Sequence, residues 1–329
     1  MKLATKIAAV SLAVVPLTAC TSNTLNSAGA TFPAPIYQRW FEDYSKETGN
    51  RVNYQSVGSG AGVRQFIAGT VNFAASDEPI DAEDAKKVKR GVVQFPAVGG
   101  TIAISYNKKG CNLKLTQKQL VDIYQGDIKD WNQVGCGNGT IRVVHRTDGA
   151  GTTYAFTNSL NAFDSSWKDV AKSVKWPVGI GGKGNEGVAG IIRNTPGSIG
   201  YVNTGFVKPN NLQVAALQNK AGKFVLPTAE TGAAALNNIK LDKNLAGTNP
   251  NPAGVNSYPI STLTWILAYK TGNTANQSIS IQKALNYMLS DKAQSLANDL
   301  GYVPLTGSVL NKSGKQLGTL VSKSKQRDA

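Results

Sequence analysis

The amino-acid sequence predicts a globular α/β protein with two domains. Its 329 residues correspond to two domains of about 150 residues each. An apolar content of 41% with 34 glycines is typical of a folded α/β protein and excludes a disordered chain. The third observation is a repeated unit, in which a short apolar run leads through a glycine-rich turn into apolar residues at helical spacing.

Residues 1–19 are predicted to be a signal peptide, because Lys2 and Lys6 precede an apolar run that is too short to span a membrane. The run ends at Leu17-Thr18-Ala19-Cys20, which resembles the lipobox of bacterial lipoproteins, with Cys20 as the lipidated first residue. Residues 20–27 would then form a tether on an exported, membrane-anchored protein that faces the periplasm or the cell exterior. The alternative is a plain signal peptide followed by an incidental cysteine.

The chain is strongly basic, with a formal charge of +15 and a pI of about 9.6. Cleavage would remove Lys2 and Lys6 and lower this charge by two, to +13. Such a surface attracts small anions or an anionic envelope, although an evenly solvated basic surface is an equal alternative. There is no zinc-finger spacing and no arginine-rich tract, so we expect neither a nucleic-acid partner nor a metal site.

Two cysteines remain if Cys20 carries lipid. An exported protein meets an oxidising compartment, which favours a disulfide between Cys111 and Cys136. This bond would close a loop of about 25 residues and stabilise the fold by ~3 kcal/mol in the chain-entropy description. The alternative is a pair of free, buried thiols.

The elements of the first part of the chain follow from periodicity and from glycine and proline positions. They are a helix with apolar residues over 36–44 after Pro33 and Pro35, a strand over 51–56, a helix over 63–67 after Gly58-Ser59-Gly60-Ala61-Gly62, a strand over 71–74 that leads to Asp77, and an exposed helix over 81–90.

A central polar stretch, residues 144–153, lies between a predicted strand (140–144) and a predicted helix (154–160). The first N–H groups of a helix have no partner inside it, and the helix dipole places partial positive charge there. Arg146 adds a planar cation that suits an oxyanion. This stretch therefore predicts a binding site for a tetrahedral oxyanion. The alternative is an ordinary glycine-rich turn with a surface arginine.

Three predicted helices begin near a hydroxyl side chain, at Thr31, Ser59 and Thr152. Hydroxyl residues are common helix N-caps, so each of them has a purely structural interpretation. Spacing alone permits their convergence on one ligand without requiring it.

The remaining elements are predicted in the same way. They are a strand over 101–107, a helix after a capping box at Thr116 and Gln119, a loop over 173–187, a helix over 187–194, a strand over 198–202, a weakly periodic segment over 203–258, a strand over 260–269, and the longest helix over 279–300. The loop is not a P-loop, because Lys183 is followed by Gly184.

Several motifs in this order resemble the periplasmic phosphate-binding proteins of the ABC-type phosphate transporter. They are Gly29-Ala30-Thr31-Phe32-Pro33-Ala34-Pro35, Val57-Gly58-Ser59-Gly60, Ala75-Ser76-Asp77, Arg146-Thr147-Asp148-Gly149-Ala150-Gly151-Thr152, Trp176-Pro177 with Gly181-Gly182-Lys183-Gly184, and Gly197-Ser198-Ile199-Gly200-Tyr201. The resemblance covers nearly all of residues 28–305.

The resemblance implies a two-lobed, type II periplasmic-binding-protein fold with the ligand in the cleft between the lobes. Two crossover segments would connect lobe one, residues 25–104 plus 259–329, with lobe two, residues 105–258. The predicted strands at 101–107 and 260–269 are the natural crossings.

The resemblance also implies roles for individual residues. Lobe one would supply N–H and hydroxyl donors from Thr31, Phe32 and Ser59, together with Asp77, which would accept a proton from the ligand. From lobe two, Arg146 would pair with phosphate and Asp148 would orient it, while the helix-start donors would be Ala150, Gly151 and Thr152. Many family members have serine at the position of Ala150, so one hydroxyl donor to a charged ligand, worth ~1.5–3 kcal/mol, is missing here.

The implied function is extracytoplasmic binding of inorganic phosphate and its delivery to the permease subunits, by a monomer without a cofactor. Phosphate near neutrality carries a proton for Asp77, whereas sulfate does not. The alternatives are a receptor for another oxyanion or a phosphate sensor of the same fold. A hydrolase is disfavoured, because the single histidine, His145, has no nucleophile positioned beside it in the sequence.

Overall fold

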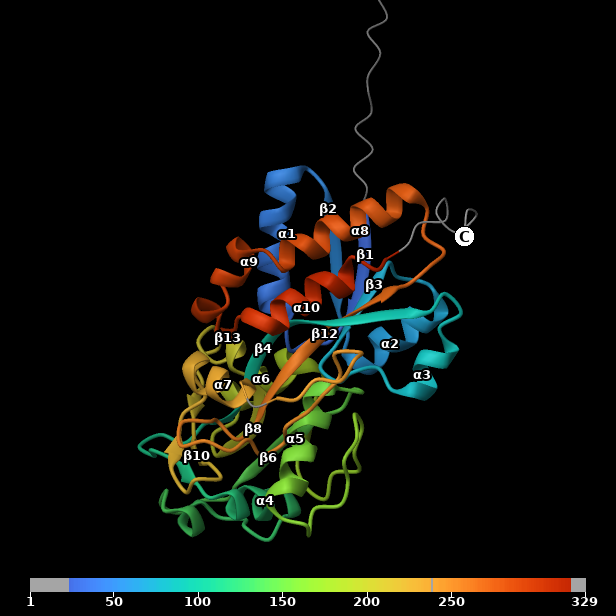
Figure 1. Ribbon diagram of the computed structural model, residues 1–329. Helices are drawn as coiled ribbons and strands as arrows, with labels where there is room; N and C mark the ends of the chain where they lie inside the picture. Colours follow the sequence, from blue (N-terminus) through green and yellow to red (C-terminus); the bar gives the residue numbers. More distant parts are fainter. Residues whose placement is uncertain (1–23, 238, 321–329) are drawn as a thin grey trace, which may run out of the picture.

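The computed structural model describes residues 24–237 and 239–320, which form two lobes stacked end to end (Figure 1). The first lobe contains the amino-terminal units and the carboxyl-terminal helices. Its elements are β1 (Thr24–Gly29), α1 (Ala34–Thr48), β2 (Arg51–Ser56), α2 (Ser59–Ala68), β3 (Phe73–Ser76), α3 (Ala82–Lys87), β12 (Ser261–Tyr269), α8 (Ala275–Met288), α9 (Asp291–Ser295), η3 (Asn298–Leu300), β13 (Tyr302–Val303) and α10 (Gly307–Leu317).

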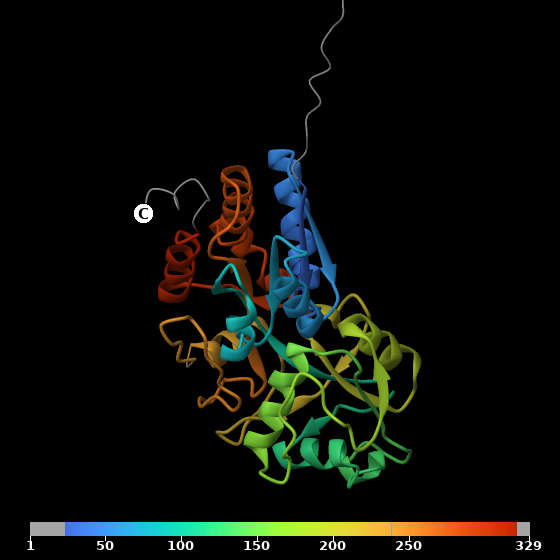
Figure 2. The same cartoon turned by 90° about the vertical axis from the view of Figure 1, so that its right-hand side faces the viewer.

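The second lobe is built from the middle of the chain, which Figure 2 shows as a separate body below the blue and orange helices. Its elements are β5 (Lys114–Leu115), α4 (Gln117–Gln125), η1 (Trp131–Val134), β6 (Arg142–Arg146), α5 (Gly151–Phe163), β7 (Ile180–Gly182), α6 (Gly184–Asn194), β8 (Ser198–Asn203), η2 (Thr204–Phe206), β9 (Gln213–Val214), β10 (Ala216–Gln218) and β11 (Phe224–Val225).

One long strand, β4 (Val92–Tyr106), belongs to both lobes. The main sheet has the order β2-β1-β3-β12-β4-β8-β6-β7. Within β4, Thr101 pairs with Ser261 of β12, whereas the next residue, Ile102, pairs with Asn203 of β8. The chain therefore crosses between lobes inside β4, about three residues before the expected boundary at 104–105.

The second crossing lies just before β12 and is hydrogen-bonded to the first. The Ile102 N–H donates to the Ile260 carbonyl over 2.9 Å. All of β12 belongs to the first lobe, where it pairs with β3 and β4. Two adjacent, hydrogen-bonded crossings form a connection about which two lobes can rotate, as in hinge closure.

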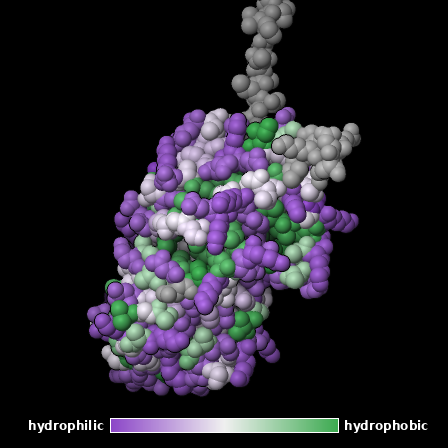
Figure 3. Space-filling view, viewed as in Figure 1, coloured by the Kyte–Doolittle hydropathy of each residue, from purple (hydrophilic) through white to green (hydrophobic). Residues whose placement is uncertain are grey.

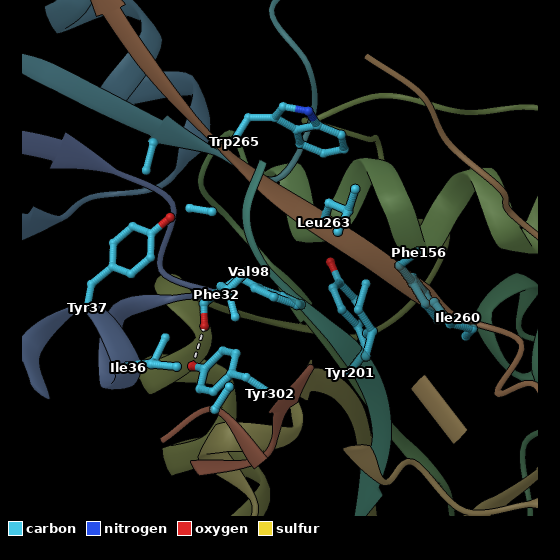
Figure 4. Packing of buried hydrophobic residues seen from close by; sticks show 14 of the residues in the cluster. Phe32, Ile36, Tyr37, Val98, Phe156, Tyr201, Ile260, Leu263, Trp265 and Tyr302 are labelled. Carbon is cyan, nitrogen blue, oxygen red and sulfur yellow. Dashed lines mark hydrogen bonds between the residues drawn. The ribbon is translucent and has the colours of Figure 1, made fainter. Parts of the chain in front are cut away.

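A continuous apolar cluster extends through both lobes along β4 and β12. Figure 4 shows Tyr37 of the first lobe at the left of the cluster and Trp265 above its middle, with Tyr201 and Phe156 of the second lobe on the right. All four side chains are fully buried. The cluster fixes the strand ends that carry the site, because close-packed interiors resist displacement.

Most predicted elements are confirmed, including the strand at 51–56, the capping box at Thr116 and Gln119, and the helix after the central polar stretch. The tether prediction for residues 20–27 is wrong in its second half. Strand β1 begins at Thr24 and pairs with both β2 and β3, so residues 24–27 lie within the sheet. Residues 20–23, including Cys20, and the predicted signal peptide lie outside the described residues.

The long helix predicted over 279–300 is also wrong. Helix α8 ends at Met288, and a new N-cap at Ser290, whose hydroxyl accepts from the Ala293 N–H, starts α9. The apolar periodicity continues through the break because both helices bury apolar residues, among them Ile281, Leu285 and Ala293. At 15 residues, α1 is longer than α8.

The weakly periodic segment contains a further helix, α7 (Ala229–Leu236), which packs against β12 and β13 of lobe one and against β4. The Leu245 carbonyl also accepts from the Trp265 indole over 2.7 Å. Part of the range assigned to lobe two, 105–258, is therefore attached to lobe one. Figure 3 shows apolar side chains gathered across the middle of this face, between more hydrophilic ends.

The structure contains the predicted disulfide between Cys111 and Cys136, with Cα atoms 5.2 Å apart. It connects the turn after β4 to the end of η1. Within residues 24–237 and 239–320, no helix is both long and apolar enough to cross a membrane. The same residues contain no cluster of three or more metal-ligating side chains.

Candidate oxyanion-binding site

The predicted site residues meet where the two lobes face each other. Thr31 follows β1, Asp77 follows β3, and Arg146 ends β6. β1 and β3 are parallel, as are β6 and β8, so these residues lie at carboxyl ends of strands. Ligands of open α/β sheets bind at such edges.

Three helices begin at this edge without a capping side chain. Neither α1, α2 nor α5 has a side-chain hydrogen bond at its N-cap, which is Pro33, Gly58 and Ala150 respectively. By contrast, α4, α7 and α8 each have a capping box. The structure therefore rejects the alternative in which Thr31, Ser59 and Thr152 are ordinary N-caps. Helix starts without a capping side chain can bind an anion, although the Gly60 and Ala150 N–H groups already donate to the Gly149 and Lys172 carbonyls.

Asp77 is the buried acid of the site, with 2% of its surface exposed. Its Oδ2 accepts a hydrogen bond of 3.0 Å from the Thr152 hydroxyl, which belongs to the opposite lobe. Its Oδ1 is buried and has no hydrogen-bond partner among the described residues. Burial raises the pKa of Asp77 from 3.8 to about 7, although the Thr152 hydroxyl and the Arg146 charge oppose this rise.

Arg146 is buried and paired with Asp148 through two of its nitrogens. Its Nε lies 2.7 Å from Oδ1 and its Nη2 lies 2.5 Å from Oδ2 of Asp148. Burial would raise the pKa of Asp148, but the Arg146 guanidinium and the Gly184 N–H outweigh it and lower that pKa. The third nitrogen, Nη1, is buried and unpaired within the described part of the chain. Asp148 therefore binds one edge of the guanidinium, and Nη1 is available to a ligand.

The remaining predicted donors lie close to Asp77. Ser59, fully buried, accepts a hydrogen bond of 3.2 Å from the Asp77 N–H, which leaves its own proton to donate. Phe32 is buried in the core of lobe one, where its carbonyl accepts from the Tyr302 hydroxyl over 2.7 Å (Figure 4). This bond anchors the backbone at the start of α1.

Ala150 differs from the role that the resemblance implies. Its N–H donates to the Lys172 carbonyl over 2.9 Å, so this donor is already used in the structure. Gly151, the next residue, lies so close to lobe one that a Cβ there would be 2.7 Å from the Ser59 hydroxyl and 2.8 Å from the Asp77 N. Glycine is therefore required for the close approach of the two lobes at this point.

The lobes are closed on each other by several direct bonds. The Gly60 N–H donates to the Gly149 carbonyl over 2.8 Å. Lys172 lies 2.9 Å from Glu78, and the Ser56 hydroxyl donates to Glu186 over 2.9 Å. These contacts surround the site residues and reduce their exposure to water.

Two functional residues that were not predicted, Gly184 and Asn185, begin α6. The Gly184 N–H donates to Asp148 Oδ1 over 3.0 Å, and Asn185 donates to the Thr31 hydroxyl oxygen. Gly184 has a φ of +71°, which favours glycine. The glycine-rich run before the helix was visible in the sequence, but its partners lie about 36 and 154 residues away.

His145 is a half-buried structural residue. Its ring stacks on Trp176 with centroids 5.1 Å apart, and Nδ1 lies 3.1 Å from the Arg146 carbonyl. Burial lowers the pKa of His145 below the ordinary value for histidine. These contacts agree with the prediction that His145 has no catalytic role.

The fold and the site define a two-lobed binding protein of the periplasmic-binding-protein type. Residues 14–292 match the PBP superfamily domain. The chain is similar to solved phosphate-binding proteins, among them PfluDING bound with phosphate (TM-score 0.76, 22% identity, 90% of this chain and 92% of that one). A second is a putative substrate-binding protein of a phosphate ABC transporter from Clostridium perfringens (TM-score 0.67, 20% identity, 86% and 100%). At these identities the likeness concerns the fold.

Sequence relatives define the family more narrowly. The chain is 41% identical over 308 residues to the phosphate-binding protein PstS of Haemophilus influenzae, covering 88% of this chain and 91% of the relative. It is 33% identical to PstS of Methanocaldococcus jannaschii, covering 81% and 77%. The chain belongs to the PstS family of phosphate-binding proteins. This is a family of binding proteins, in agreement with the prediction that the chain is not an enzyme.

Proposed function

We propose that this protein binds inorganic phosphate outside the cytoplasm and delivers it to the permease of an ABC transporter. Membership of the PstS family supports this function.

The observation that carries the proposal is the pair of buried, unpaired atoms in the cleft. Asp77 Oδ1 is an acceptor and Arg146 Nη1 is a donor, and both lack a partner among the described residues. A buried donor or acceptor atom that is left unpaired costs ~1–3 kcal/mol, and more when it belongs to a charged group. A ligand that offers both an O–H and an anionic oxygen satisfies both groups at once.

Protonated phosphate is such a ligand. It would donate its O–H to Asp77 and accept from Arg146, from the hydroxyls of Thr31 and Ser59, and from the N–H groups of Phe32, Gly151 and Thr152. Sulfate has no proton at neutral pH, so it would leave the Asp77 acceptor unpaired. The Ala150 N–H is not assigned as a donor, because Lys172 already occupies it.

Calorimetric titration of the chain from Thr21 onward tests this function. The protein is first unfolded and refolded to remove any carried-over ligand, then titrated with phosphate and with sulfate at one neutral pH. We expect tight one-to-one binding of phosphate and no heat from sulfate. Equal binding of both anions would remove Asp77 from the site, and binding of neither would contradict the proposed function.

We further propose that lipid on Cys20 holds the protein at the membrane surface. With β1 starting at Thr24, only residues 21–23 separate the lipidated cysteine from lobe one. These residues and Cys20 span at most about 14 Å, so lobe one would stay close to the bilayer. The C20S variant should move from the membrane fraction to the soluble fraction, and retention in the membrane fraction would argue against the anchor.

A further inference from the structure

We propose that Asn185 is a positioning residue for phosphate, which makes the Thr31 hydroxyl an obligatory donor to the ligand when the lobes close. The inference rests on the proposed function and assigns a role to a residue outside the predicted set. It depends on four hydrogen bonds of one buried residue and on the limited number of hydrogen bonds that a hydroxyl group can make.

Asn185 lies on lobe two but binds lobe one. It is completely buried at the start of α6. Its N–H donates to Thr31 Oγ1 over 3.0 Å, and its Nδ2 donates to the same oxygen over 2.8 Å. Both bonds cross from one lobe to the other.

The orientation of the Asn185 amide is fixed by a backbone donor. Its Oδ1 accepts a hydrogen bond of 2.8 Å from the Asn203 N–H. A backbone N–H can only donate, so the oxygen must face Asn203 and the amide nitrogen must face Thr31. The second hydrogen of Nδ2 points toward Thr152 Oγ1, at 3.5 Å.

A hydroxyl group has two lone pairs and one proton. Both lone pairs of Thr31 Oγ1 are used by Asn185, so the group has only its proton left to offer. No acceptor for that proton lies within hydrogen-bond distance among the described residues, and Thr31 is 2% exposed. An oxyanion in the cleft would accept it. The Thr152 hydroxyl differs in this respect, because it donates its proton to Asp77 and has none left for the anion.

This arrangement links ligand contact to lobe closure. In an open form Asn185 would separate from Thr31, and water could donate to Thr31 or accept from it. When the lobes close, Asn185 donates to both lone pairs of Thr31 Oγ1. The Thr31 hydroxyl can then only donate a hydrogen bond. Fixed donors suit a ligand with more lone pairs than protons, which is the case for hydrogen phosphate.

A double-mutant cycle tests the role. The phosphate Kd is measured for the parent, N185A, T31V and the double variant, and T31S is the conservative control that keeps the hydroxyl. We expect N185A to weaken binding about tenfold in the parent and less than about threefold in the T31V background, since Asn185 acts through Thr31. T31S should bind as the parent does. Equal losses from N185A in both backgrounds would overturn the proposal.

A second variant and a second measurement distinguish a positioning role of Asn185 from a purely structural role. N185D keeps the acceptor for the Asn203 N–H and the size of the side chain, and it replaces the amide donor. The new carboxylate repels phosphate equally in the parent and T31V backgrounds, so this repulsion cancels in the cycle. The coupling free energy that remains is the part of the effect that acts through Thr31. Urea unfolding of each ligand-free variant shows whether stability follows affinity.

The outcomes distinguish this inference from the proposed function. Failure of the parent to bind phosphate would contradict the proposed function itself. Tight binding by the parent with no coupling between positions 185 and 31, for either N185A or N185D, would reject the positioning role alone. Coupling in affinity without matching coupling in ligand-free stability would support it.

Discussion

The hydroxyl of Thr152, at the start of α5, donates a hydrogen bond of 3.0 Å to Oδ2 of Asp77, at the end of β3 in the other lobe. The residues are 75 positions apart in the sequence. Their contact places a carboxyl group with a raised pKa against the unpaired start of a helix. It also leaves Oδ1 of Asp77 as the free acceptor of the site. Several measurable consequences depend on this group.

Replacing Asp77 by asparagine should narrow the difference in affinity between phosphate and sulfate. The amide removes the negative charge that repels a fully ionised anion, and its NH₂ can donate to an unprotonated oxygen. We expect the D77N variant to bind sulfate measurably, and to lose part of its phosphate affinity. Calorimetric titration with both anions measures the ratio, and an unchanged ratio would remove Asp77 from discrimination.

Asp77 should also make ligand-free stability depend on pH. Its pKa is raised by burial from 3.8 to about 7, so the folded protein keeps a proton that the unfolded chain has already released. Stability therefore falls as pH rises from about 4 to about 7, by at most about 1.4 kcal/mol per pH unit, and the loss is complete above that window. The difference in unfolding free energy between parent and D77N isolates this effect from other titrating groups. A difference that stays constant from about pH 5 to about pH 8 would contradict it.

The D148N variant should lose more free energy of unfolding than free energy of phosphate binding. Without the Asp148 carboxylate, the buried Arg146 charge has no partner, which typically costs ~3–5 kcal/mol. Bound phosphate supplies negative charge to Arg146 itself, so the ligand compensates part of this cost. Urea unfolding with and without phosphate measures both effects. D122N is the matched control, since the exposed Lys118 partner makes its ion pair worth less than ~1 kcal/mol.

The G151A variant should impair closure of the lobes. The added Cβ would lie 2.7 Å from the Ser59 hydroxyl and 2.8 Å from the Asp77 backbone, both in the opposite lobe. We expect at least a tenfold loss of phosphate affinity, about 1.4 kcal/mol, with ligand-free stability little changed. Small-angle scattering with phosphate should show a more open molecule than the parent. G190A is the control, because a Cβ at Gly190 has no atom within 4 Å.

Removing the disulfide should affect stability without affecting the site. The bond between Cys111 and Cys136 closes a loop with a sequence separation of 25, and this loop contains none of the predicted site residues. The C111S/C136S variant should lose ~3 kcal/mol of unfolding free energy. Its phosphate affinity should stay within about twofold of the parent, and a larger change would mean that the loop supports the cleft.

The strand–turn–helix units were predictable because they are local. Alternation in residues 51–56 and the capping box at Thr116 and Gln119 depend on neighbours within one or two turns. The central stretch around Arg146 likewise showed a cation at an unpaired helix start. By contrast, the break at Ser290 was missed because apolar periodicity continues across it. The strand at residues 24–27 was missed because three of its four residues are polar, and only pairing with β2 and β3 shows that they lie in the sheet.

The sequence by itself determined the strand–turn–helix class of several units, the presence of an arginine beside a glycine-rich turn at a helix start, and the resemblance to one family. These depend on short-range chemistry that survives in a linear pattern. Only the tertiary structure decided which donors are free. The Ala150 N–H donates to the Lys172 carbonyl, and burial raises the pKa of Asp77. Asn185 donates to Thr31, which is 154 positions away in the sequence. Each donor or acceptor can make only a few hydrogen bonds, and the burial of a side chain depends on many neighbours. Both properties are therefore fixed only when the whole chain is folded.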